Sequence, residues 1–296
     1  MRVNILGGDG VVGYGIRMML TALNDVAIFG RESYDDGSDR YSSNALPRCD
    51  CLVHAAGVTD EEVARDDRKA IQRSIAAAIE LFETAAHAGC THLVYVSSMH
   101  VYGPLINTGA AIDERVCPVP GNVYGFCHLA TEWALRHVAV KHRLNGLIVR
   151  PGAVYGFPAP GRRMNRLQLI PYDFPGQLID TQTIVLKTAG NQYRSFCSNA
   201  YVGQLVLDWL SASTDKRDVA VVNASGDAAM TVREFADACV AIYESVTGQP
   251  GKVEIPDSLP SGSLKPVAIA DIPISLREFL LAYITFRTAE LNRPGR

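Results

Sequence analysis

The chain has 296 residues, of which 48% are hydrophobic and 20% charged, an ordinary balance for a folded protein with a substantial core. Its 28 Lys and Arg against 31 Asp and Glu leave a formal net charge of −3, which excludes nucleic-acid binding by gross positive charge. No apolar stretch reaches the roughly 20 residues of a membrane span, and the N-terminus lacks a secretory-signal pattern. Seven cysteines without C-x-x-C spacing predict free thiols in a reducing cytoplasm. We therefore expect a cytoplasmic protein of one or two domains, with no metal site and neither nucleic acid nor membrane as a partner.

The first half of the chain alternates short apolar runs with longer helical patterns. The apolar runs predict buried strands at residues 3–6, 26–29, 51–54, 93–96 and 147–149. Helical spacing of apolar residues predicts helices at residues 11–23, 61–88 and 121–142, and the polar segment 34–48 predicts a loop. This alternation predicts an α/β fold, a doubly wound parallel sheet with helices on both faces. Such sheets bind ligands at the carboxyl ends of their strands.

The chain changes character after Pro151. Residues 157–176 contain four prolines and a basic knot of Arg162, Arg163 and Arg166, which predicts a loop-rich start to a second region. The remaining patterns predict strands at 183–187 and 219–223, helices at 201–211, 232–247 and 275–289, and a loop at 253–272. We therefore expect the chain to divide near Gly156 into a ligand-binding half and a smaller C-terminal α/β region.

Gly7, Gly10 and Gly13 form a G-x-x-G-x-x-G motif between the first predicted strand and the first predicted helix. Glycines there allow a tight turn and a close approach of a pyrophosphate to the backbone, and the helix N-terminus offers N–H groups to the phosphates. The motif predicts a dinucleotide cofactor at Gly7, Gly10, Val11, Val12 and Gly13. The alternative is a tight turn without a ligand.

The end of the second predicted strand discriminates between the two nicotinamide cofactors. A carboxylate at this position holds the ribose 2′-OH of NAD, and a nearby arginine suits the 2′-phosphate of NADP. The chain reads Phe29-Gly30-Arg31-Glu32, so the carboxylate position is empty and Arg31 follows it. We therefore expect Arg31 to bind the cofactor and to favour NADP, while Glu32 leaves NAD open.

A group of polar side chains follows the strand at 93–96 and begins the helix at 121–142. Ser98 and His100 come just after the strand, and Tyr124 and His128 lie four residues apart on one helical face. A tyrosine and a serine that reach one reacting oxygen make a proton-transfer pair beside a nicotinamide. We therefore predict Ser98, Tyr124 and His128 as catalytic residues and expect His100 near the substrate.

With these motifs in view, the chain resembles the extended short-chain dehydrogenase/reductase family, the NAD-dependent epimerase/dehydratases. Besides the glycine motif, the resemblance rests on these runs in the family's order: His54-Ala55-Ala56-Gly57, the Ser-Ser-x-x-Val-Tyr-Gly run at 97–103, Tyr124-Gly125 with Glu132, the Arg-Pro-x-x-Val-Tyr-Gly run at 150–156, and a weaker Gln192-Tyr193-Arg194-Ser195-Phe196. It covers nearly the whole chain.

The resemblance implies an NAD(P)-binding Rossmann domain at residues 1–156 and a substrate-binding region at 157–296, interleaved with the first and commonly used for nucleotide sugars. It implies that Ser98 hydrogen-bonds the substrate oxygen and that Tyr124 donates or accepts the proton. Ala55, Ala56, Tyr124 and His128 would contact the cofactor. His100 and Arg194 would contact the substrate, Arg194 at a position that holds substrate phosphate in the family. A homodimer through the helices at 71–87 and 124–142 is usual in the family.

Several positions depart from the family pattern, among them Ala200 and Tyr201, where the family has acidic residues. His128 stands where the family has the Lys of Tyr-x-x-x-Lys, which binds ribose hydroxyls and lowers the pKa of the tyrosine. Ser74 replaces the family's Asn on the long helix, and Ala153 replaces the Asn of Arg-Pro-x-Asn. A packed or solvated helical histidine is the alternative interpretation of His128.

The replacement at His128 has a chemical consequence. A free tyrosine has a pKa of about 10, so without a permanent cation only about one part in a thousand is tyrosinate at pH 7. A reaction that needs Tyr124 as a base suffers, whereas a carbonyl reduction uses the neutral phenol as proton donor. The sequence therefore predicts a reductase or epimerase acting on a nucleotide-linked or similar keto sugar, with a bias toward reduction. The alternative is a catalytically impaired protein that binds a dinucleotide.

Overall fold

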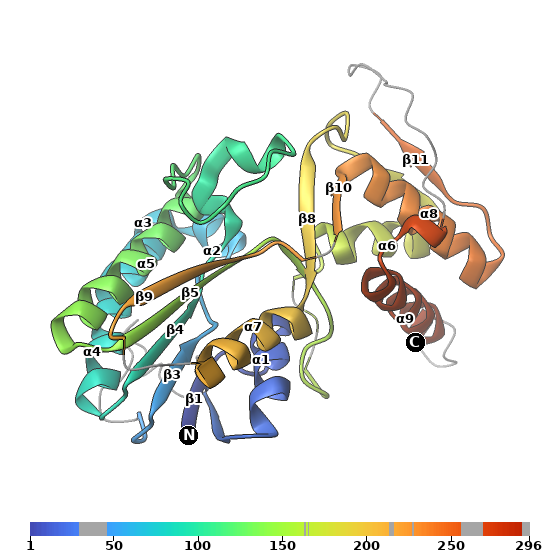
Figure 1. Cartoon of the computed structure of the whole chain (residues 1–296). Helices are drawn as coiled ribbons and strands as arrows, with labels where there is room; N and C mark the ends of the chain where they lie inside the picture. The colour runs from blue at the N-terminus through green and yellow to red at the C-terminus, as the bar shows by residue number, and fades with distance from the viewer. Residues whose placement is uncertain are drawn as a thin grey trace.

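Six parallel strands form the central sheet of the larger lobe in the order β2-β1-β3-β4-β5-β9 (Figure 1). The computed structural model describes residues 1–29, 46–162, 164, 166–212, 216–226, 228–255 and 269–291. The strands are β1 (Arg2–Leu6), β2 (Asp25–Phe29), β3 (Cys51–His54), β4 (His92–Val96), β5 (Asn145–Pro151) and β9 (Val219–Ala224). The predicted doubly wound parallel sheet is confirmed.

Helices cover both faces of this sheet. Val3 and Ile5 of β1 pack in one apolar cluster with α1 (Val11–Thr21) and α7 (Asn199–Ala212). Leu6, on the opposite face, packs with α4 (Ala78–His87) and α5 (Val123–His142). This alternation follows from the two-residue period of a strand, and burial on both faces explains why the strands read as continuous apolar runs.

The single helix predicted at residues 61–88 is wrong in detail, because the structure divides it. Asp66 is extended (φ −158°, ψ 94°), which ends α2 (Asp60–Arg65), and its carboxylate caps α3 (Asp67–Gln72) by accepting from the Lys69 N–H. A π-helical turn, η2 (Arg73–Ala77), then leads into α4. An aspartate between two helical patterns signals such an N-cap, and the apolar periodicity alone does not show it.

The smaller lobe is built on β8 (Tyr193–Ser198), which lies between β6 (Ala153–Tyr155) and β10 (Ala228–Thr231). Its core joins Tyr172, Phe196, Phe235 and Phe279. The remaining elements of this lobe and its junction are α6 (Ile170–Thr181), β7 (Thr183–Val185), α8 (Val232–Thr247), β11 (Lys252–Glu254), η4 (Ile269–Asp271) and α9 (Ile274–Leu291).

Two expectations for the second half need adjustment. The loop predicted through residue 176 ends at Ile170, where α6 begins, because a proline in the first helical turn removes an N–H that has no intrahelical partner there. The strand predicted at 219–223 is β9, which pairs with β5 at the edge of the six-stranded sheet. The chain therefore returns from the smaller lobe to the larger one.

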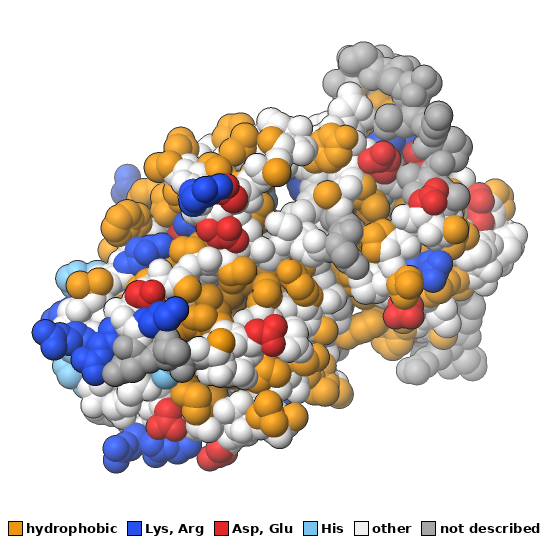
Figure 2. All heavy atoms as spheres, in the orientation of Figure 1, with side chains coloured by type: hydrophobic (Ala, Val, Ile, Leu, Met, Phe, Trp, Pro, Cys, Tyr) orange, Lys and Arg blue, Asp and Glu red, His pale blue; other side chains and the backbone are white. Residues whose placement is uncertain are grey.

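The surface drawn in Figure 2 carries basic and acidic side chains interspersed with hydrophobic ones. Among the described residues, no helix combines the length and apolar character that a bilayer crossing requires.

Candidate active site

A cleft of about 1110 Å³ lies at the carboxyl ends of the central strands and is closed from the other side by α6, β8 and β10. All but one of the predicted site residues border it, although they come from five separate segments. These are Gly7, Gly10, Val11, Val12, Gly13, Ala55, Ala56, Ser98, His100, Tyr124, His128 and Arg194. Arg31, on which the NADP preference rests, lies outside the described residues.

The glycine motif occupies the point where the strand order reverses, between β1 and β3. Gly7 adopts φ +84°, and a Cβ on Gly13 would lie 2.1 Å from the Gly7 carbonyl oxygen, so the turn can form only without side chains there. Gly10 is the N-cap of α1 and makes no side-chain cap, and the following residues Val11 and Val12 face the cleft. This arrangement fits the pyrophosphate of a dinucleotide, which the N-terminus of α1 would bind.

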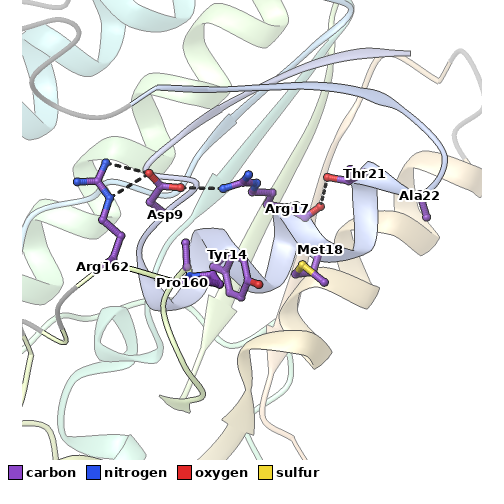
Figure 3. A pocket seen from close by; sticks show the side chains of 9 residues that line it. Asp9, Tyr14, Arg17, Met18, Thr21, Ala22, Pro160 and Arg162 are labelled. Atoms are coloured by element: carbon purple, nitrogen blue, oxygen red, sulfur yellow. Dashed lines mark hydrogen bonds and ion pairs between the residues drawn. The ribbon is translucent and has the colours of Figure 1, made fainter.

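Asp9, inside the same motif, carries a negative charge close to this phosphate-binding turn. Its carboxylate accepts from Arg17 of α1 at 2.8 Å and from Arg162 at 2.9 Å, as Figure 3 shows. The Asp9 carbonyl also accepts from the Ala159 N–H at 3.1 Å. The two arginines neutralise the carboxylate and tie residues 159–162 to the glycine turn. The hollow drawn in Figure 3 borders this cluster on the outer side of α1.

Ser98 and Tyr124 come together where η3 (Met99–Asn107) meets the start of α5. Ser98 accepts from the His100 N–H at 3.2 Å, and Ser98 and Tyr124 border the same cleft, where the Ser98 hydroxyl acts to lower the pKa of the phenol. Asn122 caps α5 by accepting from the Gly125 N–H at 2.8 Å. A Cβ on Gly125 would lie 2.4 Å from the His100 carbonyl oxygen, so this glycine allows α5 to approach η3 closely.

The half-buried position of Tyr124 keeps its phenol protonated. Removal from water raises the pKa of Tyr124 above its ordinary value, and the charge of Arg166 and the Ser98 hydroxyl act in the opposite direction. His100 stands edge-on to the Tyr124 ring at 5.3 Å, and burial lowers the pKa of His100. At neutral pH the site therefore presents a neutral phenol beside a neutral imidazole.

His128 lies one helical turn beyond Tyr124, with the two ring centroids 4.6 Å apart. Its Nδ1 is 2.7 Å from the Tyr95 hydroxyl, and burial lowers the pKa of His128 to about 3. The His128 ring is therefore uncharged at neutral pH. It does not supply the positive charge that lysine supplies in the Tyr-x-x-x-Lys motif. His128 Nε2 is buried and has no hydrogen-bond partner in the described part of the chain. A buried polar atom beside a cleft is best explained by a ligand that binds there.

Ser74, at the position of the family's Asn, lies in the π-helical turn and is buried. Its hydroxyl donates to the Ala70 carbonyl at 2.8 Å, and its own carbonyl accepts from Thr131 at 2.9 Å. Ser74 does not border the cleft. The side chain at this position therefore bonds within the protein, and the π turn joins α4 to α5 through the Thr131 contact.

Glu132 and Arg150, which the sequence indicates only as members of motifs, form a buried ion pair behind the site. Arg150 donates to Glu132 from Nε at 2.9 Å and from Nη2 at 2.6 Å, and the Ser97 hydroxyl donates to the same carboxylate at 2.6 Å. Arg150 also donates to the Tyr102 hydroxyl at 2.7 Å. The network fixes Ser97, and with it the end of β4 that carries Ser98.

Arg166 and Asp60 also border the cleft, and neither was predicted as a site residue. The only signal was the basic knot that contains Arg166. Arg194, predicted to contact substrate phosphate, borders the cleft and donates to the Asn107 side chain and the Tyr193 carbonyl. Away from the cleft, Glu83, His87 and His142 bring three atoms of metal-binding type within 4.8 Å of one another, and Glu83 already accepts from Lys141 and His142.

Comparisons with known proteins agree with this geometry. A curated relative, dTDP-6-deoxy-L-talose 4-dehydrogenase (NAD(P)(+)) from Kitasatospora kifunensis, is 25% identical over 256 residues, which cover 80% of this chain and 77% of the relative. The structure of UDP-glucuronic acid 4-epimerase from Bacillus cereus, with UDP-glucuronic acid and NAD, superposes with a TM-score of 0.75 at 17% identity, covering 97% of this chain and 100% of that one. The structure of RMD from Pseudomonas aeruginosa with NADPH gives a TM-score of 0.74 at 20% identity, covering 97% and 99%.

The family assignment rests on a longer match. The model of the NAD dependent epimerase/dehydratase family matches residues 3–206, which include the glycine motif, Ser98, Tyr124 and Arg194. With that match and a cleft built at the switch point of a doubly wound sheet, the chain belongs to the NAD dependent epimerase/dehydratase family.

Proposed function

We propose that this protein is an NAD(P)H-dependent reductase of a keto sugar linked to a nucleotide, with Tyr124 as proton donor. The observation that carries the proposal is the neutral Tyr124 phenol, which borders the same cleft as Ser98 and lies next to an uncharged His128. The relatives named above support the substrate class, because their names specify dTDP-linked and UDP-linked sugars. Bound nicotinamide would supply the hydride.

Tyr124 and Ser98 are placed to act on one carbonyl oxygen. Both residues border the same cleft, and Ser98 acts on the Tyr124 phenol, so one substrate oxygen can accept from both hydroxyls at once. The phenol holds its proton at neutral pH and can donate it when the oxygen becomes an alkoxide. Epimerisation begins with the reverse step, in which Tyr124 accepts a proton, and burial disfavours the tyrosinate that this requires.

His128 fits a role in holding the cofactor. With the Tyr95 hydroxyl as donor to Nδ1, the ring proton sits on Nε2, which has no partner among the described residues. An Nε2–H beside the cleft can donate to a ribose hydroxyl, which is the binding half of the task of the family's lysine. The preference for NADP over NAD rests on Arg31 alone and stays a prediction.

The first test compares the two directions of the reaction at pH 7. Wild-type protein should reduce a dTDP-linked 4-keto-6-deoxy sugar with NADPH faster than it oxidises the matching alcohol with NADP⁺. Tyr124→Phe should lower the reduction rate by about 10²–10⁴-fold, because it removes the proton donor. Tyr201→Phe, which changes an exposed tyrosine of α7, is the matched control and should leave the rate unchanged. Faster oxidation than reduction would refute the reductase assignment.

The competing function is dinucleotide binding without catalysis, which the replaced lysine and the high pKa of Tyr124 favour. Titration with NADPH and NADH, followed by His128→Lys, separates the two. Tight cofactor binding with weak wild-type turnover and a large gain in His128→Lys would mark a degenerate site. Unchanged or lowered turnover in that variant would mark His128 as adapted to its task, and failure to bind either cofactor would remove both functions.

We also infer a homodimer through α5, as expected from the family resemblance. Phe126, Trp133 and Val140 of α5 are exposed by 43%, 65% and 75%, and their spacing of seven residues places them on one helical face. A second copy of the chain would cover this apolar stripe. Trp133→Glu should convert a dimer into a monomer in sedimentation velocity, whereas Leu23→Glu, at an exposed leucine beyond α1, should not. A monomeric wild type would refute the inference.

A further inference from the structure

The replacement of the family's lysine leaves the question of which positive charge stabilises Tyr124 after it gives up its proton. His128 is uncharged at neutral pH, so the cation must come from elsewhere in the cleft. Three arginines border the cleft in the described part of the chain: Arg65, Arg166 and Arg194. Of these, Arg166 is the one whose positive charge acts on the Tyr124 phenol and favours its anion.

Arg166 reaches the cleft from the segment between β6 and α6, on the side opposite α5. Its side chain is 29% exposed, and its Nη2 lies 3.9 Å from the Asp60 carboxylate, the first residue of α2. Its Nε is buried and has no hydrogen-bond partner among the described residues. The guanidinium is thus oriented by one distant carboxylate and retains donor capacity for a group inside the cleft.

We propose that Arg166 is the cation of this active site and performs, from the opposite wall of the cleft, the electrostatic half of the task that Lys performs in Tyr-x-x-x-Lys. The proposal rests on the proposed reductase function and names a further residue for its proton transfer. In this chain the lysine's two tasks are divided, with His128 placed for the ribose hydroxyl and Arg166 for the phenol.

The proton transfer shows why the charge is needed. The O–H bond of Tyr124 breaks and an O–H bond forms on the substrate oxygen, whose carbon receives hydride from the reduced nicotinamide. Tyr124 is left as an anion in a half-buried site, where an unpaired charge is costly. Of the charged groups that act on this anion, Arg166 favours it and Asp60 disfavours it, and the neutral Ser98 hydroxyl also favours it. The neighbouring rings of His100 and His128 are neutral. A proton from solvent then restores the phenol.

The same guanidinium could instead bind a phosphate or carboxylate of the substrate, and the two roles predict different kinetics. Loss of a phosphate contact that is made equally in the ground state and the transition state raises KM and leaves kcat unchanged. Loss of a charge whose partner anion forms only during proton transfer lowers kcat. The split between KM and kcat therefore decides between them.

The test uses three variants of the full-length protein. Arg166→Gln removes the charge and keeps most of the length, Arg166→Lys keeps the charge, and Arg115→Gln removes an arginine whose side chain is 91% exposed. For Arg166→Gln we expect kcat for keto-sugar reduction to fall by about 10-fold or more, with KM and NADPH affinity within about threefold of wild type. Arg166→Lys should restore most of kcat, and Arg115→Gln should match wild type.

A second readout does not depend on turnover. Fluorotyrosine labelling lowers phenol pKa values into an accessible range, and Tyr124→Phe identifies the Tyr124 signal in ¹⁹F NMR. Arg166→Gln should raise the pH midpoint of that signal by about one to three pH units, and Arg115→Gln should leave it in place. An unchanged midpoint, or a raised KM with unchanged kcat, would overturn the proposal. If wild type reduces no keto sugar, the reductase function fails, while the NMR comparison still decides the role of Arg166.

Discussion

Two polar pairs lie side by side across the interface of β4 and α5, and they differ in charge and in completeness. Tyr95 of β4 and Ser97, the residue just beyond its end, hydrogen-bond with His128 and Glu132, which lie four residues apart on α5. The Ser97–Glu132 pair is completed by the Arg150 charge, and every hydrogen bond of the carboxylate stays inside the protein. The Tyr95–His128 pair is neutral and leaves Nε2 without a partner among the described residues.

The ionic pair stabilises the structure around the site, whereas the neutral pair is placed to bind a ligand. A buried ion pair with satisfied hydrogen bonds stabilises one arrangement of its elements and gains nothing from a ligand. A buried pair with an open donor is stabilised further when a ligand binds, so it costs stability until the cofactor arrives. Glu132 and Arg150 lie behind the cleft, whereas His128 borders it.

The largest expected effect comes from breaking the ionic pair. Glu132→Gln leaves the Arg150 charge buried without its counterion, since the two side chains are 1% and 4% exposed. We expect the free energy of unfolding to fall by about 3–5 kcal/mol. Urea denaturation monitored by circular dichroism measures this, with Glu278→Gln, an exposed glutamate of α9, as the control.

A double variant shows whether charge is the cause. Glu132→Leu with Arg150→Met removes both charges and should be more stable than Glu132→Gln, because no unpaired charge remains. If Glu132→Gln lost less than about 1 kcal/mol, the ion pair would not be the element that holds the end of β4.

The neutral pair predicts a pH dependence of stability. The pKa of His128 is about 3 in the folded protein and about 6.5 in an unfolded chain, so the unfolded state binds the proton first as pH falls. Stability should therefore decrease between about pH 6.5 and pH 3, by at most about 1.4 kcal/mol per pH unit from this group. His128→Asn should reduce the slope of unfolding free energy against pH over that range.

His137→Asn is the matched control for that slope, since His137 is exposed on the same helix. It should keep the wild-type dependence. Equal slopes for wild type and His128→Asn would mean that the His128 ring takes up its proton in the folded protein, and the contrast between the two pairs would then disappear.

The sequence predicted the parts of the site that local pattern determines. Glycine spacing fixes the turn at Gly7 and Gly13, and a four-residue spacing puts Tyr124 and His128 on one helical face. The order of strands and helices was sufficient to predict the parallel sheet and the cleft at its carboxyl edge. The structure brings these motif residues to one cleft, and their roles stay predictions.

The remaining features depend on tertiary packing. Arg166 lies 42 residues beyond Tyr124, and nothing in its local pattern shows that it faces the phenol. The neutrality of His128 follows from burial, which the sequence around it does not determine. The π turn around Ser74 arises where α3 continues into α4 against α5, and apolar periodicity does not distinguish it from an ordinary helix.

A more exposed ion pair, between Arg162 and Asp9, gives the smallest expected effect and sharpens the contrast with the buried ion pair. Arg162 pairs with Asp9 at 2.9 Å, yet the Arg162 side chain is 57% exposed and Asp9 keeps Arg17 as a second partner (Figure 3). Water screens such a pair, so Arg162→Gln should change the free energy of unfolding by less than about 1 kcal/mol. Urea denaturation of Arg162→Gln and Glu132→Gln under the same conditions compares their losses of unfolding free energy. A loss comparable to that of the buried pair would show that stability follows the number of charged contacts, whereas a small loss would show that it follows their burial.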